Sequence, residues 1–214
     1  MRPRAKALLP GDPVHLGTYQ VTGRLGAGAY GTVFLAQDPA SRLVAIKVVK
    51  PTHAPENDLS RYEREVGALR RIRSPRVVTY LDHGEDPSHG LWLALEYVNG
   101  ASLYDWCRPL FPAGRYTAEG WQQGERPMVG YLLLNVLQDL LVGLRDLHGA
   151  GVMHRDLHPG NVMVPFDVHK VHIRPPAYVV LLDLGLSLHG NQRFTTSAEA
   201  IGHWVFTPPE QRSY

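Results

Sequence analysis

An aspartate and an asparagine five residues apart carry the clearest chemical signal in this 214-residue chain. Asp156 can act as a base toward a hydroxyl group, and the amide oxygen of Asn161 can bind a metal ion. Asp183 follows the apolar run 178–182, and Gly185 lies two residues after it. An aspartate that leaves a buried strand in this way is a good ligand for Mg²⁺. Taken alone, the first segment could be a polar turn with an Asx cap, and the second would carry no signal.

A lysine and a glutamate in the first half of the chain predict a buried ion pair. Lys47 stands at the end of the apolar run 44–46. Glu65 lies three residues after Tyr62 and four before Leu69, on the apolar face of a predicted helix. A carboxylate there is costly to bury unless it is paired. Lys47 is its natural partner, and the pair would direct the ammonium group toward phosphate oxygens. The alternative for Lys47 by itself is a surface lysine on an edge strand.

Three glycines, Gly26, Gly28 and Gly31, have the spacing G-x-G-x-x-G. The spacing alone is weak evidence, because dinucleotide-binding turns and simple hairpins both carry it. A dinucleotide-binding fold needs a helix after the glycines, whereas residues 32–35 have the pattern of a strand. A glycine-rich turn between two strands instead allows backbone N–H groups to close over a triphosphate.

The spacing of apolar residues predicts an antiparallel lobe followed by a helical one. Apolar and polar residues alternate on both sides of the glycines, which is typical of strands. Apolar residues then recur every three to four positions over 59–72, which predicts a helix that Pro75 ends. The elements predicted for the first lobe are strands on either side of the glycines, a strand at 43–49, a loop at 51–58, the helix at 59–72, and strands at 76–81 and 91–98. An apolar stripe over 132–147 predicts a core helix that ends at Gly149 and Gly151.

Composition narrows the range of partners. Lys and Arg total 22 against 20 Asp and Glu, a net charge of +2, so nothing favours nucleic acid or an anionic membrane surface. The longest apolar stretch, 132–144, contains polar and charged side chains and is too short to cross a bilayer. The single cysteine, Cys107, cannot form an internal disulfide, which favours a reducing compartment and predicts a cytoplasmic protein. We therefore expect no nucleic-acid partner and no membrane span in this chain.

Six segments stand in the order used by the eukaryotic-type protein kinase superfamily, which the chain resembles from residue 19 to residue 214. They are the glycine loop at 26–31, Val-Ala-Ile-Lys at 44–47, Glu65, His-Arg-Asp…Asn at 154–161, Asp-Leu-Gly at 183–185 and Pro-Pro-Glu at 208–210. The run Pro-Pro-Glu-Gln makes bacterial Ser/Thr kinases the closest likeness.

The resemblance implies an α+β, bilobal fold: an antiparallel five-stranded N-lobe with one helix, and a mainly helical C-lobe. The implied division is an N-terminal tail at 1–18, an N-lobe at 19–98 and a C-lobe at 99–214. Because the family's fold continues with several helices after Pro-Pro-Glu, this C-lobe is expected to be incomplete.

The resemblance also assigns roles to individual residues. Asp156 would orient the acceptor hydroxyl, Lys47 and Glu65 would form the phosphate-binding pair, and Asn161 and Asp183 would hold Mg²⁺. The residues expected to contact ATP are Leu25, Gly26, Ala27, Gly28, Ala29, Tyr30, Gly31, Val33, Ala45, Lys47, Glu96, Val98 and Met163. The expected internal spine, next to a gatekeeper at Leu95, consists of Leu69, Tyr80, His154 and Leu184. Arg155 would pair with a phosphate on the activation segment, whose candidate acceptors are Thr195, Thr196 and Ser197.

The implied activity is transfer of the γ-phosphate of ATP, with Mg²⁺ or Mn²⁺, to Ser/Thr hydroxyls of proteins, with self-phosphorylation in trans as a further possibility. Two alternatives stay open. Asp-Leu-His-Pro-Gly-Asn also resembles the catalytic loop of aminoglycoside and choline kinases, which act on small molecules, and the chain could instead be an inactive nucleotide-binding fragment or pseudokinase. Three positions depart from the usual protein kinase pattern: His158 replaces a lysine, His203 a threonine and Leu184 a phenylalanine.

Overall fold

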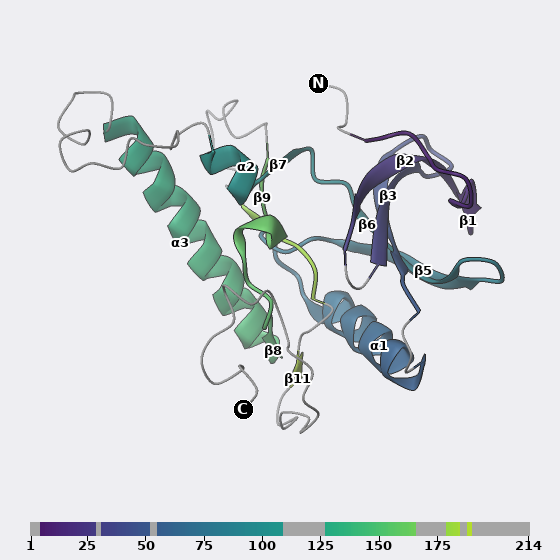
Figure 1. Ribbon diagram of the computed structural model, residues 1–214. Helices are drawn as coiled ribbons and strands as arrows, with labels where there is room; N and C mark the ends of the chain where they lie inside the picture. Colours follow the sequence, from purple (N-terminus) through teal and green to yellow (C-terminus); the bar gives the residue numbers. More distant parts are fainter. Residues whose placement is uncertain are drawn as a thin grey trace, which may run out of the picture. The chain divides into compact units, whose positions relative to one another are not determined.

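The computed structural model describes residues 5–28, 31–51, 55–108, 127–165, 179–184 and 188–189. Contacts divide the chain into two compact units, and Figure 1 labels most of the helices and strands of both. Unit 1 comprises Met1–Arg71 and Val78–Tyr97, and unit 2 comprises Ile72–Val77 and Val98–Tyr214. A single boundary between residues 98 and 99 therefore misses the segment 72–77, which packs within the second unit.

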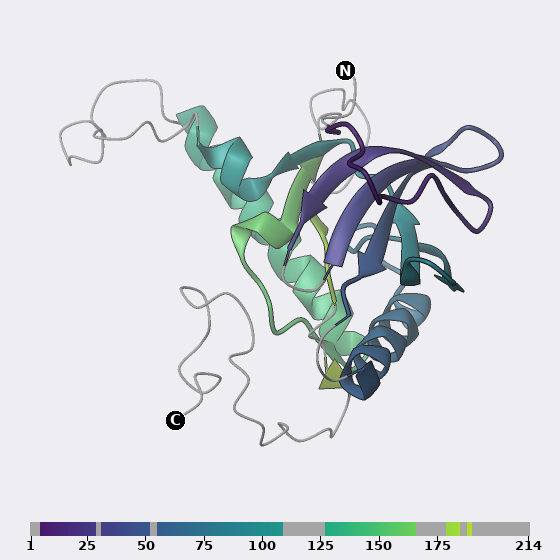
Figure 2. The same ribbon diagram turned by 45° about the vertical axis from the view of Figure 1, so that its right-hand side comes forward.

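Unit 1 is built on one antiparallel sheet with a helix beside it (Figures 1 and 2). Its elements are β1 (His15–Leu16), β2 (Tyr19–Ala27), β3 (Gly31–Gln37), β4 (Leu43–Val49), α1 (Pro55–Arg71), β5 (Tyr80–Asp86) and β6 (Gly90–Glu96). In the order β1-β2-β3-β4-β6-β5, every neighbouring pair is antiparallel. Tyr19 and Val21 of β2 are buried while Gln20 and Thr22 are exposed, as a strand with one face on the core requires.

Tyr62 ties α1 to the sheet. Its hydroxyl lies 3.0 Å from the carbonyl oxygen of Trp92 in β6 and 3.2 Å from that of Gly84 in β5. Because a carbonyl only accepts, the phenol must keep its proton to make these bonds. Burial raises the pKa of Tyr62 to about 12, so the hydroxyl stays a donor at neutral pH.

Two predicted elements of unit 1 are displaced in the structure. α1 begins at Pro55, so the predicted loop at 51–58 is wrong over its last four residues; a proline suits the first turn of a helix. The strand predicted at 76–81 lies instead at 80–86. Val77 belongs to unit 2, where it forms an isolated parallel bridge with Leu181. β5 is polar at many of its positions, and its pairing with the largely buried β6 makes it a strand.

The N-terminal segment is part of the sheet, so the predicted tail at 1–18 is wrong for its described residues. His15 and Leu16 pair with Gln20 and Tyr19 to form β1, which gives six strands where five were expected. Leu16 is 0% exposed and joins the core cluster of the sheet. One buried leucine among prolines and polar residues has no periodic pattern, which is why the sequence suggested a tail.

Unit 2 combines helices with two small sheets in its described part. Its elements are β7 (Gly100–Ser102), α2 (Leu103–Cys107), α3 (Pro127–Gly149), β8 (Val152–Met153), the 3-10 helix η2 (Pro159–Asn161), β9 (Val162–Pro165), β10 (Val180–Leu181) and β11 (Leu188–His189). The strands form an antiparallel β10-β9-β7 sheet and an antiparallel pair of β11 with β8. The predicted core helix is α3, and Gly151 follows it with a left-handed φ of 72°. Over the described ranges, no helix has the length and apolar character needed to cross a membrane.

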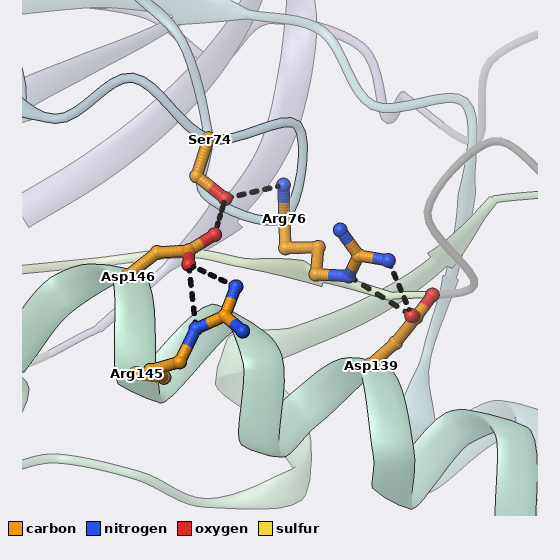
Figure 3. Close-up of polar contacts among 5 residues, drawn as sticks. All are labelled: Ser74, Arg76, Asp139, Arg145 and Asp146. Atoms are coloured by element: carbon orange, nitrogen blue, oxygen red, sulfur yellow. Dashed lines mark hydrogen bonds and ion pairs between the residues drawn. The ribbon is translucent and has the colours of Figure 1, made fainter.

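The segment 72–77 is anchored on α3 by two polar contacts (Figure 3). Ser74 donates its hydroxyl to Asp146 at 2.6 Å, and Arg145 donates to the other oxygen of Asp146 at 2.9 Å. Arg76 donates Nε and Nη2 to Oδ1 of Asp139 at 2.9 and 2.7 Å. Since Asp139 is buried, this guanidinium compensates a carboxylate that would be costly by itself. These contacts explain why a segment between α1 and β5 belongs to unit 2.

We expect Leu16→Ala to lower the free energy of unfolding by about 2–5 kcal/mol, the usual cost of truncating a buried leucine. Leu9→Ala is the matched control, because Leu9 is 55% exposed and exposed positions usually change stability by about 0.5 kcal/mol or less. Urea unfolding followed by fluorescence measures both. Equal effects of the two substitutions would contradict a core role for Leu16.

The Ser74–Asp146 contact predicts a pH dependence of stability. The Ser74 hydroxyl, followed by Arg145, lowers the pKa of Asp146 below its ordinary 3.8. The unfolded chain therefore binds this proton at a higher pH than the folded chain does. The stabilisation is present above about pH 4 and is lost as pH falls through the lowered pKa. Asp146→Asn should be less stable than the unsubstituted protein at pH 7, and the difference should shrink toward about pH 3.

Thermal melts at several pH values test this expectation. Ser74→Ala should show the same convergence in weaker form, because it removes the strongest of the bonds that lower the pKa. A stability difference between Asp146→Asn and the unsubstituted protein that stayed constant from pH 7 to about 3 would rule out the linkage.

Candidate active site

Lys47 and Glu65 form the predicted ion pair inside unit 1. Lys47 lies in β4, opposite Val33 of β3 on one side and Leu93 of β6 on the other. Its Nζ donates to both carboxylate oxygens of Glu65 in α1, at 2.9 and 3.0 Å. The residues are 7% and 3% exposed, so the alternative of a surface lysine on an edge strand is excluded. A bidentate, charge-assisted contact of this kind holds the ammonium group in one place.

The glycine loop joins β2 to β3, and the space beside its glycines differs from one to another. A Cβ added to Gly26 or Gly28 would meet nothing within 4 Å, so the backbone there has open space beside it. A Cβ on Gly31 would instead collide with the carbonyl oxygen of Val48. Gly31 is thus required by packing, whereas space beside the other two leaves their backbone accessible to a ligand. Gly28 N–H donates to Gly31 O at 2.8 Å, and Ala29 and Tyr30 lie outside the described residues.

The candidate adenine contacts of unit 1 lie on neighbouring strands. Ala45 of β4 is opposite Leu95 of β6, and Glu96 follows Leu95 at the end of β6. The Glu96 N–H donates to Thr79 O at 2.9 Å, and its carboxylate accepts from Thr79 N–H at 3.1 Å. The backbone N–H of Glu96 is therefore already used, which leaves its carbonyl as the group to offer to a base.

In unit 2, Asp156 and Asn161 contact each other within one loop. The Asn161 side-chain N–H₂ donates to the Asp156 carbonyl at 3.0 Å and to its carboxylate at 3.2 Å. Because the amide nitrogen faces Asp156, the amide oxygen faces away and is available to a cation. Leu182 N–H donates to Asn161 O at 2.8 Å. This bond joins the loop to the residue before Asp183.

A carboxylate and an amide oxygen are ligands that suit Mg²⁺. In the described parts of the chain, no three His, Cys, Asp or Glu side chains converge as a metal site. One carboxylate and one amide oxygen do not fill the coordination shell of Mg²⁺, which in nucleotide sites usually takes further ligands from phosphate oxygens and water.

Two residues next to this chemistry have left-handed backbone conformations. Arg155 has φ of 63° and Asp183 has φ of 53°, which are uncommon for residues other than glycine. Conformations of this kind persist when surrounding bonds over-determine them. His154 supplies one such bond, since its Nε2 lies 2.9 Å from Leu182 O and must donate to it. Burial lowers the pKa of His154 below its ordinary 6.5, so the ring is neutral at pH 7.

His158 has a role that the sequence did not predict. It is the N-cap of η2, and its Nδ1 accepts the Gly160 N–H at 3.1 Å. A Cβ on Gly160 would lie 2.8 Å from Cε1 of the His158 ring, so this bond needs a glycine. The other ring nitrogen, Nε2, lies 3.9 Å from the Asp156 carboxylate. A histidine two residues before a glycine was the available signal, because N-cap side chains accept from that position.

The remaining predicted residues either lie in one of the two units or belong to segments outside the described residues. Of the predicted spine, Leu69 and Tyr80 lie in unit 1, while His154 and Leu184 are buried in unit 2. Met163 lies in β9, opposite Val180 of β10. Outside the described residues lie Thr195, Thr196, Ser197, His203 and the run 208–210.

The buried pair predicts a non-additive effect on stability. Glu65→Leu leaves the Lys47 ammonium buried without its carboxylate and should cost about 3–5 kcal/mol. Lys47→Met with Glu65→Leu removes both charges, and the double variant should be more stable than Glu65→Leu alone. Urea unfolding of both single variants and the double variant completes the cycle. Additive losses would show that the two charges do not depend on each other.

Comparisons with known proteins place these site residues in a known family. A family model described as "Protein kinase domain" matches residues 19–211. The probable serine/threonine-protein kinase PkwA of Thermomonospora curvata is 31% identical over 206 residues, which cover 95% of this chain and 24% of that protein. The human calcium/calmodulin-dependent protein kinase type 1B is 36% identical over 200 residues, which cover 92% of this chain and 51% of that protein.

A solved structure shares the fold. The kinase domain of PknI from Mycobacterium tuberculosis has a TM-score of 0.60 and 29% sequence identity, over 84% of this chain and 63% of that chain. The present chain spans about a quarter of the length of PkwA, at 24%. The matched region contains the glycine loop, the Lys47–Glu65 pair and the Asp156–Asn161 loop. The chain belongs to the protein kinase family.

Proposed function

We propose that the protein transfers the γ-phosphate of ATP to serine or threonine hydroxyls of proteins, with Mg²⁺ as the required ion. The observation that carries this proposal is the buried Lys47–Glu65 pair at 2.9 Å. A lysine without a partner is costly to bury, and a sheet that needed only stability would be served as well by two apolar residues. A fixed ammonium next to a glycine loop suits a triphosphate.

In this proposal the described residues of unit 1 bind the nucleotide. Backbone N–H groups of the loop from Leu25 to Gly31, with Val33, would cover the phosphates, and Lys47 would contact the α- and β-phosphates. Ala45 and Val33 would pack on one face of the adenine. Glu96, through its carbonyl, and Val98 would bind the edge of the base.

The residues of unit 2 would carry out the transfer. Asp156 would orient the acceptor hydroxyl and take its proton, and the bond from Asn161 would keep that carboxylate aimed. Asn161 and Asp183 would hold Mg²⁺, which neutralises charge on the phosphates when it is bound. Catalysis would then consist of positioning and electrostatic stabilisation of a loose transition state.

Protein rather than small-molecule substrates are supported by two features. Arg155 stands directly before Asp156, where it could pair with a phosphorylated residue of the activation segment. We propose Thr195, Thr196 and Ser197 as acceptors, modified by a second copy of the chain in trans. PkwA and the human relative are both named protein kinases, which disfavours the small-molecule alternative.

A reducing, cytoplasmic location is also part of the proposal. Cys107 is a free, half-buried cysteine, and burial raises the pKa of its thiol. Such a thiol is unreactive, which fits a structural rather than a redox role.

Lys47→Met should abolish phosphoryl transfer to a protein substrate, because the α- and β-phosphates lose their fixed cation. Lys50→Met is the matched control, since Lys50 is exposed, and it should keep full activity. Transfer from radiolabelled ATP to casein measures both variants. An inactive wild-type protein would refute the proposed function, and an active Lys47→Met variant would refute the assignment of Lys47.

Asp156→Asn and Asp183→Asn should both eliminate turnover and differ in binding. Asp183 is proposed to hold the ion, so its loss should weaken Mg·ATP binding by about tenfold or more, whereas Asp156→Asn should mainly lower kcat. Calorimetric titration with Mg·ATP separates them, with Glu63→Gln as the control at an exposed position. Weaker binding by Asp156→Asn and unchanged binding by Asp183→Asn would reverse the two roles.

A further inference from the structure

Residues 5–16, which we call the N-terminal strap, precede the region matched by the family model and pair with the outer edge of β2. Lys6 and Arg24 exchange two backbone hydrogen bonds, each 2.8 Å long. Val21 N–H donates to Val14 O at 2.9 Å, and β1 continues the pairing to Tyr19. The strap thus supplies partners for backbone groups that an edge strand otherwise presents to solvent.

A side-chain contact reinforces the pairing. Asp12 accepts the Leu9 N–H at 2.8 Å, and the same oxygen lies 3.5 Å from Nε of Arg24. The Arg24 guanidinium also lies 5.8 Å from the centre of the Phe34 ring. The side chains of Arg24 and Asp12 are 22% and 12% exposed. This shelter makes the ion pair stronger than one at a fully exposed surface.

Arg24 lies between two irregularities of β2. The register with β3 shifts between Val21 and Gly23 and again between Arg24 and Gly26. Irregularities of this kind bend a strand and increase its twist. Gly23 and Arg24 therefore form a short regular step between two bends, and only Leu25 separates this step from the glycine loop at 26–31.

The strap lies directly against this step. A Cβ added to Gly23 would lie 2.8 Å from the Lys6 carbonyl oxygen and 2.9 Å from the Ala5 Cβ. A side chain at this position would have to displace backbone, which is costlier than moving a flexible side chain. Gly23 therefore allows the close approach on which the Lys6–Arg24 hydrogen bonds depend.

We propose that the N-terminal strap positions the glycine loop for nucleotide binding by holding the Gly23–Arg24 step at its base. The proposal rests on the ATP-binding role of that loop. Asp12 and Arg24 act as positioning residues and do not touch the nucleotide. Without the strap, the loop would sample more conformations, and binding would have to order it at a cost in affinity. The loss should appear in the KM for ATP more than in kcat.

Two substitutions displace the strap without touching its buried residues. Gly23→Ala forces Lys6 away from β2, and Asp12→Asn removes the charge that faces Arg24. We expect each to raise the KM for ATP by about fivefold, the lower end of coupling between separate sites, with kcat changed less than about twofold. Asp12→Glu should restore a KM near that of the wild type. Gly67→Ala is the control, because a Cβ there would meet nothing within 4 Å.

The readouts distinguish a positioning role from a structural one. A lowered melting temperature with an unchanged KM for ATP in both variants would overturn the proposal. If the wild-type protein shows no transfer at all, the proposed function fails, and hydrogen exchange then decides the role of the strap. Amides of residues 25–28 should exchange faster in Gly23→Ala than in the wild type, with amides of β6 as the reference. Equal exchange in that loop would overturn the positioning role independently of activity.

Discussion

The Lys47 ammonium and the Glu65 carboxylate constrain unit 1 more than any apolar contact does, because the burial of each depends on the other. Lys47 lies in a central strand with neighbours on both sides. Its charge is compensated by the Glu65 carboxylate of α1. Sliding α1 by one residue would turn Glu65 about 100° away from the sheet and break both of its bonds to the Lys47 ammonium.

In unit 2 the equivalent constraint is the network around Asn161. One side-chain amide bonds to both the backbone and the carboxylate of Asp156, while the Asn161 carbonyl accepts from Leu182. The two left-handed residues, Arg155 and Asp183, lie on either side of this network. Their conformations cost free energy by themselves, and the hydrogen bonds of Asn161 and His154 offset that cost. A carboxylate bonded in this way is held in one orientation.

The N-terminal strap and the segment 72–77 show how each unit recruits chain from outside its continuous run. Leu16 completes the core of the sheet, and the strap occupies the edge that β2 would otherwise expose. Ser74 and Arg76 carry the segment after α1 onto α3, through Asp146 and Asp139 (Figure 3). In both cases, polar or isolated residues form the attachment, so a hydrophobic pattern could not reveal it.

The sequence by itself determined the elements whose signal is local: the strands on both sides of the glycines, the strand at 43–49, the helix that carries Glu65 and the long helix α3. It also predicted the Lys47–Glu65 pair, because a buried charge requires a partner and Lys47 was the natural one. The spacing of Asp156 and Asn161 indicated a base and a metal ligand in one loop, and the hydrogen bonds between them were seen only in the structure. Tertiary structure decided the register of β5, the placement of 72–77 and the packing of the strap. These depend on pairing with residues distant in sequence, and backbone hydrogen bonds can form with almost any side-chain type. Composition and periodicity therefore could not predict these features.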